Sequence, residues 1–539
     1  MRKVSLLAVL FALILALPGW AAPNPPDLFR DAAVKAKAPD DDAAVVRSRL
    51  VTVNFKPLTG ARKAQPAKAR FQINLFPEVS YVALLERTVN PGQNHLSWYG
   101  SLEGVEGSQV VLIAGGGTLM GSVRTPHESY RIRYVGEVGI HAIEEVDTSL
   151  YPKESEPVLV EGDETGPTAG SESPFLVKLL DDGSTFDLLV VYTPAARAAA
   201  GGTTAIQNLI ALGVAETNQA YANSNVVPRL QLVHTEEIAY TESGNIQTDV
   251  NRLRSQTDGI MDSVHTLRNT YKADLVMLVG NSMAGGCGIA YAIMAGTNNR
   301  AFESSAFCYT DRTCISPNYT FGHELGHLMG SNHAPGDPTG TGAYSWSFGY
   351  KDPGASFRTM MAYDCPNGIC PRVLQFSNPN VNYMGLPTGT WSQNNATSIT
   401  NVRSEVANFR QAAAQTSCSG TSGQWSGCRG NGCNVCLEKV ANYPLYYHNH
   451  PSCSVNYICG GQYFTCNANC PAPNAADQCN GTPGQWAGCR GNGCNVCEEL
   501  VANYPNYFKN HPACQRNFTC SGQYFTCNAH CPAPTAADL

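Results

Sequence analysis

Residues 323–333 read HELGHLMGSNH, and this stretch predicts the fold and chemistry of the region around it. His323 and His327 are four residues apart, so on an α-helix they share one face and can bind one metal ion. Glu324 lies beside that face, where it can act on a metal-bound water. Gly330 lets the chain leave the helix through a left-handed turn, which returns His333 as a third ligand. Three protein ligands with an open fourth position are typical of a catalytic zinc site, because a structural zinc has four.

The motif resembles the HExxHxxGxxH signature of the metzincin zinc endopeptidases. Residues 358–364 read RTMMAYD and resemble the Met-turn of that family, with Met361 as the methionine beneath the metal. Residues 175–412 as a whole resemble bacterial members of the reprolysin (adamalysin) branch. The segments that carry this resemblance are FDLLVVYT (186–193), DLVMLVG (274–280) and GCGIAYAI (286–293).

The resemblance implies a twisted, mostly parallel sheet over an active-site helix that binds one catalytic Zn2+ ion. It also implies that segment 288–293 is an antiparallel edge strand along which an extended peptide substrate lies. A pairing of Cys287 with Cys314 is implied as well, with Cys308 left as a buried free thiol in a strand. Pairing of Cys308 with Cys314 is the competing prediction, and Cys365 and Cys370 are close enough in sequence to close a small loop.

The chain departs from the reprolysin pattern after the third histidine. Reprolysins usually have an aspartate there, whereas this chain has Ala334, and the nearest aspartate is Asp337. Tyr363, two residues after Met361, resembles the tyrosine that astacins and serralysins place near zinc. Tyr363 is therefore a candidate for a transition-state or ligand role, and the alternative is a tyrosine that only packs under the helix.

Independently of the resemblance, the pattern across residues 173–414 alternates strands with helices and predicts an α/β domain with a mostly parallel sheet. Apolar runs predict strands at 186–192, 226–233 and 273–279. Helical spacing predicts one long helix over 194–222 and a second over 250–271.

The first part of the chain reads as a leader followed by a removable β-rich domain. Arg2 and Lys3 precede an apolar run that ends in small residues at Ala21, which predicts a signal peptide over residues 1–21. Residues 22–172 alternate apolar and polar positions and predict an antiparallel β propeptide. Its last part, 151–173, is rich in Pro, Gly and acidic residues and predicts an exposed linker. The propeptide has no cysteine, so latency must use another ligand or occlusion; the carboxylates considered are Asp27, Asp31, Glu144 and Asp147.

The end of the chain is a tandem repeat with a period of 61 residues, because CRGNGCNVC begins at Cys428 and again at Cys489. Repeat 1 spans 417–477 and repeat 2 spans 478–539. Small units so rich in cysteine in an exported protein predict disulfide-stapled modules. Their many aromatic residues make a surface or carbohydrate ligand one hypothesis, and aromatics that fill a small core are the alternative.

The composition limits the function classes. A net charge of -7 provides no basic stripe of the kind that nucleic acid requires, and no segment after the leader is long and apolar enough to span a membrane. We therefore expect a secreted, extracellular zinc endopeptidase made as a pre-pro-enzyme, acting on proteins or peptides. The alternatives are an inactive protease fold that binds a surface through its repeats, and a zinc hydrolase of small or non-peptide substrates. The sequence does not indicate whether calcium is bound.

Overall fold

The computed structural model describes residues 25–33, 42–60, 70–92, 95–159, 181, 183–293, 299–338, 340, 342–366 and 370–410, and four short strands in the repeats. The predicted signal peptide lies outside the described residues, as do most of the repeat residues. The chain divides into two compact units, residues 1–412 and 413–539. The first unit contains the predicted propeptide and the predicted catalytic region.

The N-terminal part of the first unit is one antiparallel nine-stranded sheet, as the alternating pattern predicts. The strand order is β1-β2-β9-β8-β7-β6-β5-β4-β3, and neighbouring strands are antiparallel throughout. In β3 every second side chain is buried up to Leu75, which is the period of a strand with one face on a core. The elements are β1 (Phe29–Asp31), β2 (Val45–Val53), α1 (Lys56–Gly60), β3 (Arg70–Phe76), β4 (Val79–Gly92), β5 (His95–Leu102), β6 (Gln109–Gly115), β7 (Thr118–Arg124), β8 (Ser129–Tyr134), β9 (Ile140–Val146) and η2 (Thr148–Leu150).

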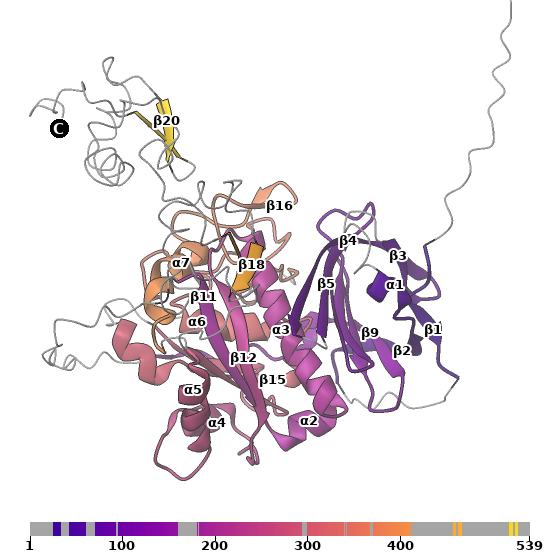
Figure 1. The fold of residues 1–539 in the computed structure, drawn as a ribbon, viewed down its shortest axis with the longest axis horizontal. Helices are drawn as coiled ribbons and strands as arrows, with labels where there is room; N and C mark the ends of the chain where they lie inside the picture. Colours follow the sequence, from indigo (N-terminus) through magenta and orange to yellow (C-terminus); the bar gives the residue numbers. More distant parts are fainter. Residues whose placement is uncertain are drawn as a thin grey trace, which may run out of the picture. The chain divides into compact units, whose positions relative to one another are not determined.

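The second part is a six-stranded, mostly parallel sheet with helices against it, which confirms the predicted α/β fold (Figure 1). Its order is β10-β14-β15-β13-β11-β12, and β14 is antiparallel to β15, as the resemblance implied. Every residue of β13 and β15 is buried, which explains their continuous apolar runs. The elements are β10 (Val158–Leu159), β11 (Thr185–Tyr192), α2 (Pro194–Ala200), α3 (Thr203–Asn223), β12 (Arg229–Glu237), α4 (Ile246–Arg254), α5 (Ser263–Tyr271), β13 (Leu275–Gly280), β14 (Gly288–Ala292), η3 (Asn299–Ser305), β15 (Phe307–Asp311), η4 (Arg312–Cys314), α6 (Thr320–Leu328), β16 (Asn382–Tyr383), β17 (Leu386–Pro387) and α7 (Asn395–Val406).

Both predicted long helices are broken in two. The helix predicted over 194–222 stops at Gly201, whose φ of 97° is left-handed, and α3 then leaves at 93° to α2. The helix predicted over 250–271 ends at Ser255, and a turn that includes Gly259 (φ 78°) separates α4 from α5. At Gly201 the left-handed backbone, which is inexpensive for glycine, ends the helix, whereas α4 ends at Ser255 in an extended conformation and the turn with Gly259 follows.

Helix α3 joins the two sheets of the first unit. It packs against β6 and β7 of the N-terminal sheet and against β12 of the second sheet, and it lies between them in Figure 1. Asn208 on α3 donates hydrogen bonds to the Gly115 carbonyl (3.0 Å) and to Thr118 Oγ1 (2.5 Å). The β-rich domain is therefore docked on the catalytic region through this helix.

The prediction that 151–173 is an exposed linker is wrong for its first part. Tyr151 and Glu154 are only 8% and 4% exposed. Residues 158–159 form β10, which adds to the free edge of β14 in parallel register, with Val158 opposite Tyr291. Backbone pairing with a neighbouring sheet edge orders this segment although its composition is that of a linker.

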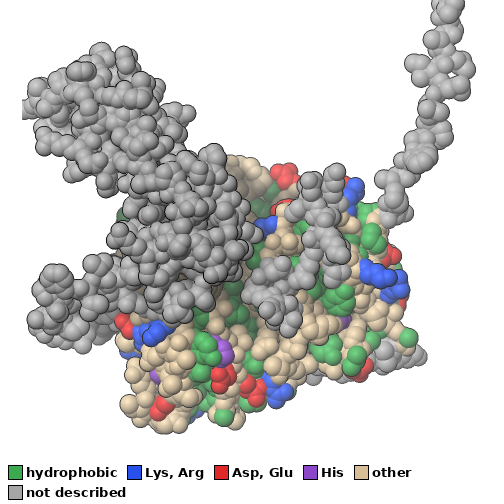
Figure 2. Space-filling model, in the orientation of Figure 1, with side chains coloured by type: hydrophobic (Ala, Val, Ile, Leu, Met, Phe, Trp, Pro, Cys, Tyr) green, Lys and Arg blue, Asp and Glu red, His purple; other side chains and the backbone are tan. Residues whose placement is uncertain are grey.

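The described surface shows no broad region of one charge on the face seen in Figure 2, where basic and acidic side chains are interspersed. No single described helix combines the length and apolar character needed to cross a membrane; α2 and α3 taken together pass that test, but they meet at a sharp bend.

In the second unit each repeat has one described antiparallel hairpin. The hairpins are β18 (Asn456–Cys459) with β19 (Gln462–Thr465) and β20 (Asn517–Cys520) with β21 (Gln523–Thr526). They occur at equivalent positions, as expected from the tandem repeat. The predicted disulfides of the repeats lie outside the described residues, and the surface or carbohydrate ligand stays a prediction.

Candidate metal centre and active site

The three predicted histidines meet at one point. Their Nε2 atoms are separated by 3.1 Å (His323 to His333), 3.2 Å (His323 to His327) and 3.1 Å (His327 to His333), and all three side chains are buried. A tetrahedral zinc with Zn–N bonds of about 2.0–2.1 Å places its ligand nitrogens about 3.3 Å apart. The donor set thus fits a single zinc ion.

The other ring nitrogen of each histidine contacts a backbone carbonyl. His323 Nδ1 lies 3.0 Å from Met360 O, and His327 Nδ1 lies 3.0 Å from Ser331 O. His333 Nδ1 lies 2.6 Å from Pro338 O. A carbonyl can only accept, so each Nδ1 carries the proton and each Nε2 lone pair points to the centre. Burial lowers the pKa of all three rings, that of His323 to about 3, which keeps them neutral. Three neutral imidazoles whose lone pairs converge are suited to a cation.

The turn predicted at Gly330 is present. Helix α6 ends at Leu328, and Gly330 has a φ of 75°, in the left-handed region. A Cβ at this position would also lie 2.5 Å from the Cβ of Ala343, so both conformation and space require glycine. The turn brings His333 back to the helix face that carries His323 and His327.

Two methionines lie under the active-site helix at glycines that the sequence reasoning did not single out. A Cβ on Gly326 would approach Met361 Sδ to 2.5 Å, and a Cβ on Gly322 would approach Met360 Sδ to 2.7 Å. Met361 is fully buried, as predicted for the methionine beneath the metal. The spacing of two glycines four residues apart on one helix face was the signal in the sequence for this close packing.

Glu324 is fully buried next to the histidines, and neither carboxylate oxygen has a hydrogen-bond partner among the described residues. Burial raises the pKa of the Glu324 carboxyl well above its usual range, and the charge of Glu154 raises it further. A Cβ on Gly288 of β14 would lie 2.5 Å from Glu324 Oε1, so this glycine provides the space that the carboxylate occupies. Because its pKa is raised, the ionised form of this carboxyl would be a stronger base toward a water at the centre than an exposed glutamate is.

Tyr363 lies beside the histidine cluster. Its ring centroid lies 4.3 Å from that of His333, and its hydroxyl donates a 2.6 Å hydrogen bond to the backbone carbonyl of Glu154. Asp337 accepts a hydrogen bond from the Tyr363 backbone N–H (3.0 Å) and pairs with Lys351. Asp337 thereby connects the loop of the third histidine to the Met-turn.

An unexpected neighbour of the site comes from the predicted linker. The Glu154 carboxylate forms a bidentate ion pair with Arg372 (2.5 and 2.9 Å), and Thr320 Oγ1 donates to it as well (2.9 Å). Burial alone would raise the pKa of Glu154, but the charge and hydrogen bonds of Arg372 hold it well below its usual range. No sequence signal marked this pair, because its members are 218 positions apart.

The four carboxylates considered for latency lie elsewhere. Glu144 pairs with Arg131 and Arg133, and Asp31 pairs with Arg49. Asp147 caps the turn at Ser149, and Asp27 bridges to Gln72 on the edge strand β3. The carboxylates of Glu144, Asp31 and Asp147 are thus held by contacts within the N-terminal part of the chain, and Asp27 is bound there through its backbone.

The cysteines of the catalytic region follow the resemblance. Disulfides join Cys287 to Cys314 and Cys365 to Cys370, and Cys308 is a buried free thiol in β15. The first bond ties the start of β14 to the turn before α6, and the second closes the loop after the Met-turn. Both lie next to the site and hold the segments that surround it.

A mostly parallel sheet, a helix with two histidines, a third histidine returned by a turn and a methionine turn beneath them define a metzincin-type zinc metalloprotease. Residues 182–377 match a reprolysin model described as metallo-peptidase family M12. A peptidyl-Asp metalloendopeptidase of Stenotrophomonas maltophilia is 39% identical over 318 residues, which are 56% of this chain and 71% of the relative. One of Xanthomonas campestris is 37% identical over 335 residues, covering 58% and 75%.

The chain therefore belongs to this family of metalloendopeptidases, and it is a zinc metalloendopeptidase that acts on proteins or peptides. Among solved structures, metalloproteinase-II from Bacteroides fragilis aligns with 52% of this chain and 87% of its own, at 11% identity and a TM-score of 0.32. At this TM-score and identity, the similarity supports no conclusion about the fold or the function of this chain. The comparisons do not favour the alternative of an inactive surface-binding protein.

Proposed function

We propose that this chain is the precursor of a secreted zinc endopeptidase in which Glu324 is the general base and His323, His327 and His333 bind the metal. The observation that carries the proposal is the convergence of three Nε2 lone pairs beside a buried carboxylate without a hydrogen-bond partner among the described residues. Zinc bound there would polarise a water and the scissile carbonyl. Glu324 takes the proton of the attacking water and delivers it to the nitrogen of the leaving amine.

The similar proteins are named peptidyl-Asp metalloendopeptidases, and this name supports a proposal about the cleavage site. We propose that this chain also cleaves next to aspartate. The test is digestion of an unfolded protein by the processed enzyme, with the cut sites read by mass spectrometry. Cuts that cluster at aspartate support the proposal, and cuts without any preference for acidic residues overturn it.

Tyr363 is proposed to donate a hydrogen bond to the substrate carbonyl as it becomes an oxyanion, because its hydroxyl already donates to a peptide carbonyl, that of Glu154. Removal of one such donor typically costs on the order of 100-fold in kcat. We expect Tyr363→Phe to lower kcat by about that factor with little change in KM. Steady-state kinetics on one peptide measure the split, and full turnover in the variant would show that Tyr363 only packs.

The zymogen part of the proposal is supported by the docking of the N-terminal sheet. The segment 153–159 lies on the edge of β14, where Ser155 N–H donates to Gly288 O (2.9 Å) and Cys287 N–H donates to Lys153 O (3.1 Å). The resemblance implies that substrate lies along this edge. A peptide could pair with β14 only after this segment has left, so we propose that removal of residues 22–172 activates the enzyme.

Docking of the propeptide includes a buried carboxyl that titrates near neutrality. Glu216 on α3 accepts hydrogen bonds from Ser122 of β7 (2.6 Å) and from Ser316 (2.7 Å), and burial raises its pKa to about 7. The folded state thus binds the proton more tightly than the unfolded chain between about pH 4.5 and 7. The Glu216 carboxyl makes its full contribution to the free energy of unfolding below this pH range. That contribution falls as the pH rises through the range, by about 3 kcal/mol in total.

We therefore expect Glu216→Gln to stabilise the precursor relative to the parent above pH 7 and to change it little at pH 4.5. Both chains carry Glu324→Gln to prevent self-cleavage. The measurement is the difference in unfolding midpoint between the two chains across this pH range. A difference that does not vary with pH would show that Glu216 is ionised in the folded precursor throughout.

A further inference from the structure

Arg372 is a buried cation that holds a carboxylate from a part of the chain proposed to be removed. The side chains of Arg372 and Glu154 are 3% and 1% exposed. The remaining described hydrogen-bond acceptors of the guanidinium are two backbone carbonyls, Asn318 O (2.8 Å) and Ala362 O (3.3 Å). When Glu154 leaves with the propeptide, Arg372 loses the carboxylate that satisfies its charge.

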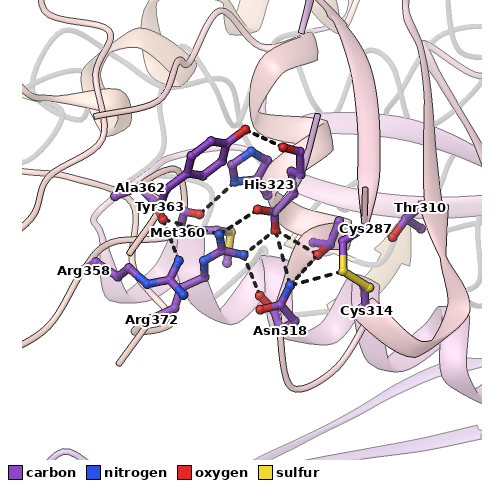
Figure 3. Close-up of polar contacts among 12 residues, drawn as sticks. Cys287, Thr310, Cys314, Asn318, His323, Arg358, Met360, Ala362, Tyr363 and Arg372 are labelled. Carbon is purple, nitrogen blue, oxygen red and sulfur yellow. Dashed lines mark hydrogen bonds and ion pairs between the residues drawn. A yellow bond between two sulfur atoms is a disulfide. The ribbon is translucent and has the colours of Figure 1, made fainter. Parts of the chain in front are cut away.

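The other groups around the Glu154 carboxylate belong to the catalytic region and stay behind. Thr320 Oγ1 lies 2.9 Å and Asn318 Nδ2 lies 3.4 Å from Glu154 Oε1, and Thr320 begins the helix that carries the histidines. Figure 3 shows the side chains of Arg372 and Asn318 converging on one carboxylate, with Tyr363 and His323 nearby. Departure of Glu154 would leave a space lined by these residues, with the buried cation of Arg372 at its base.

This pocket opens beside the reacting centre. The carbonyl of the residue that fills it is bound by Tyr363, whose ring contacts His333. The next residue, Ser155, pairs with Gly288, the glycine that faces the Glu324 carboxylate. Gly286 allows the close approach, because a Cβ there would lie 2.6 Å from Lys153 O. A residue whose side chain enters the pocket therefore has its backbone at the catalytic groups.

We propose that Arg372, with Thr320 and Asn318, is the specificity pocket for an acidic substrate side chain next to the cleaved bond, and that Glu154 fills this pocket in the precursor. The inference rests on the proposed function and deepens it. A guanidinium binds a carboxylate through two parallel hydrogen bonds, whereas an amide offers one acceptor and no charge. Discrimination against the amide is large because it leaves the buried cation unpaired.

The first test compares peptides that differ only in Asp, Asn, Glu or Gln at one position, using the processed enzyme. The parent enzyme is expected to prefer Asp over Asn by on the order of 100-fold or more in kcat/KM. Arg372→Gln should bring that ratio close to one, and Arg372→Lys should reduce it in part. The matched control is Arg358→Gln, since Arg358 is also buried and contacts Ala362 O, but its ion pair is with Asp364, whereas Glu154 pairs with Arg372. An Asp-to-Asn ratio of kcat/KM that is unchanged in Arg372→Gln would show that Arg372 does not select the acidic side chain.

A binding measurement distinguishes two failures: that of the pocket assigned to Arg372, and that of the proposed peptidase activity. The same peptides, labelled, are titrated against the processed Glu324→Gln chain by fluorescence anisotropy. If the parent hydrolyses no peptide, the proposed function fails, while tighter binding of Asp than of Asn that is lost in Arg372→Gln still supports the pocket. Equal binding of both peptides overturns it.

The second test addresses Glu154 in the full-length precursor. We expect Glu154→Gln to weaken occupation of the pocket and to increase cleavage of the Asp peptide by unprocessed chain at least tenfold. Glu156→Gln is the matched control, because Glu156 lies in the same segment and is exposed. Equal activity of the Glu154→Gln and Glu156→Gln precursors would show that Glu154 does not block the pocket.

Discussion

Replacement of Glu324 by glutamine is expected to lower kcat for peptide hydrolysis on the order of 10³-fold while the chain keeps its metal. The amide has nearly the shape of the carboxylate, so it fits the space that Gly288 provides, but it cannot take the proton of the attacking water. The three Nε2 atoms that would bind the ion are untouched. The measurements are kcat on an Asp-containing peptide and the metal content per chain.

The metal content is what makes this experiment decisive. Loss of activity together with loss of metal would mean that the substitution disturbs the site, and Glu324→Asp would then be compared. Turnover near that of the parent enzyme, with metal bound, would remove Glu324 as the general base. A different group would then have to accept the proton, and Glu324 is the one buried carboxylate among the described residues with both oxygens lacking a hydrogen-bond partner.

Removal of the metal is the second change with a very large expected effect. Dialysis of the processed enzyme against 1,10-phenanthroline should abolish hydrolysis, and one equivalent of Zn2+ should restore it. Three imidazoles suit zinc, whereas Mg2+ and Ca2+ prefer oxygen ligands, so neither of those ions should restore activity. His327→Ala should abolish metal binding in the same assay, since it removes one of three ligands.

A matched control for that substitution is His265→Ala. His265 is a half-buried histidine on α5 whose Nε2 contacts Ser255 O, and it lies outside the metal cluster. Its replacement should leave the metal content unchanged. Restoration of activity by Mg2+ alone, or a His327→Ala chain that still binds zinc with the parent affinity, would contradict the assignment of the three ligands.

The sequence by itself determined those parts of the protein that depend on local periodicity. The four-residue spacing of His323 and His327 places them on one helix face, and a left-handed glycine at position 330 returns the third histidine. Alternation of apolar residues was sufficient for the antiparallel N-terminal sheet. Apolar spacing alone misjudged the two long helices, because it carries no penalty for the glycines that end α2 and separate α4 from α5.

Only the tertiary structure decided which distant residues surround the centre. Glu154 looked like part of a solvated linker, since composition reports the average behaviour of a segment and not a single buried contact. Its carboxylate is placed by the pairing of 153–159 with β14 and by a guanidinium more than two hundred positions later. Such a contact depends on the closure of long loops by the whole fold, and nothing in the local sequence of either partner records it.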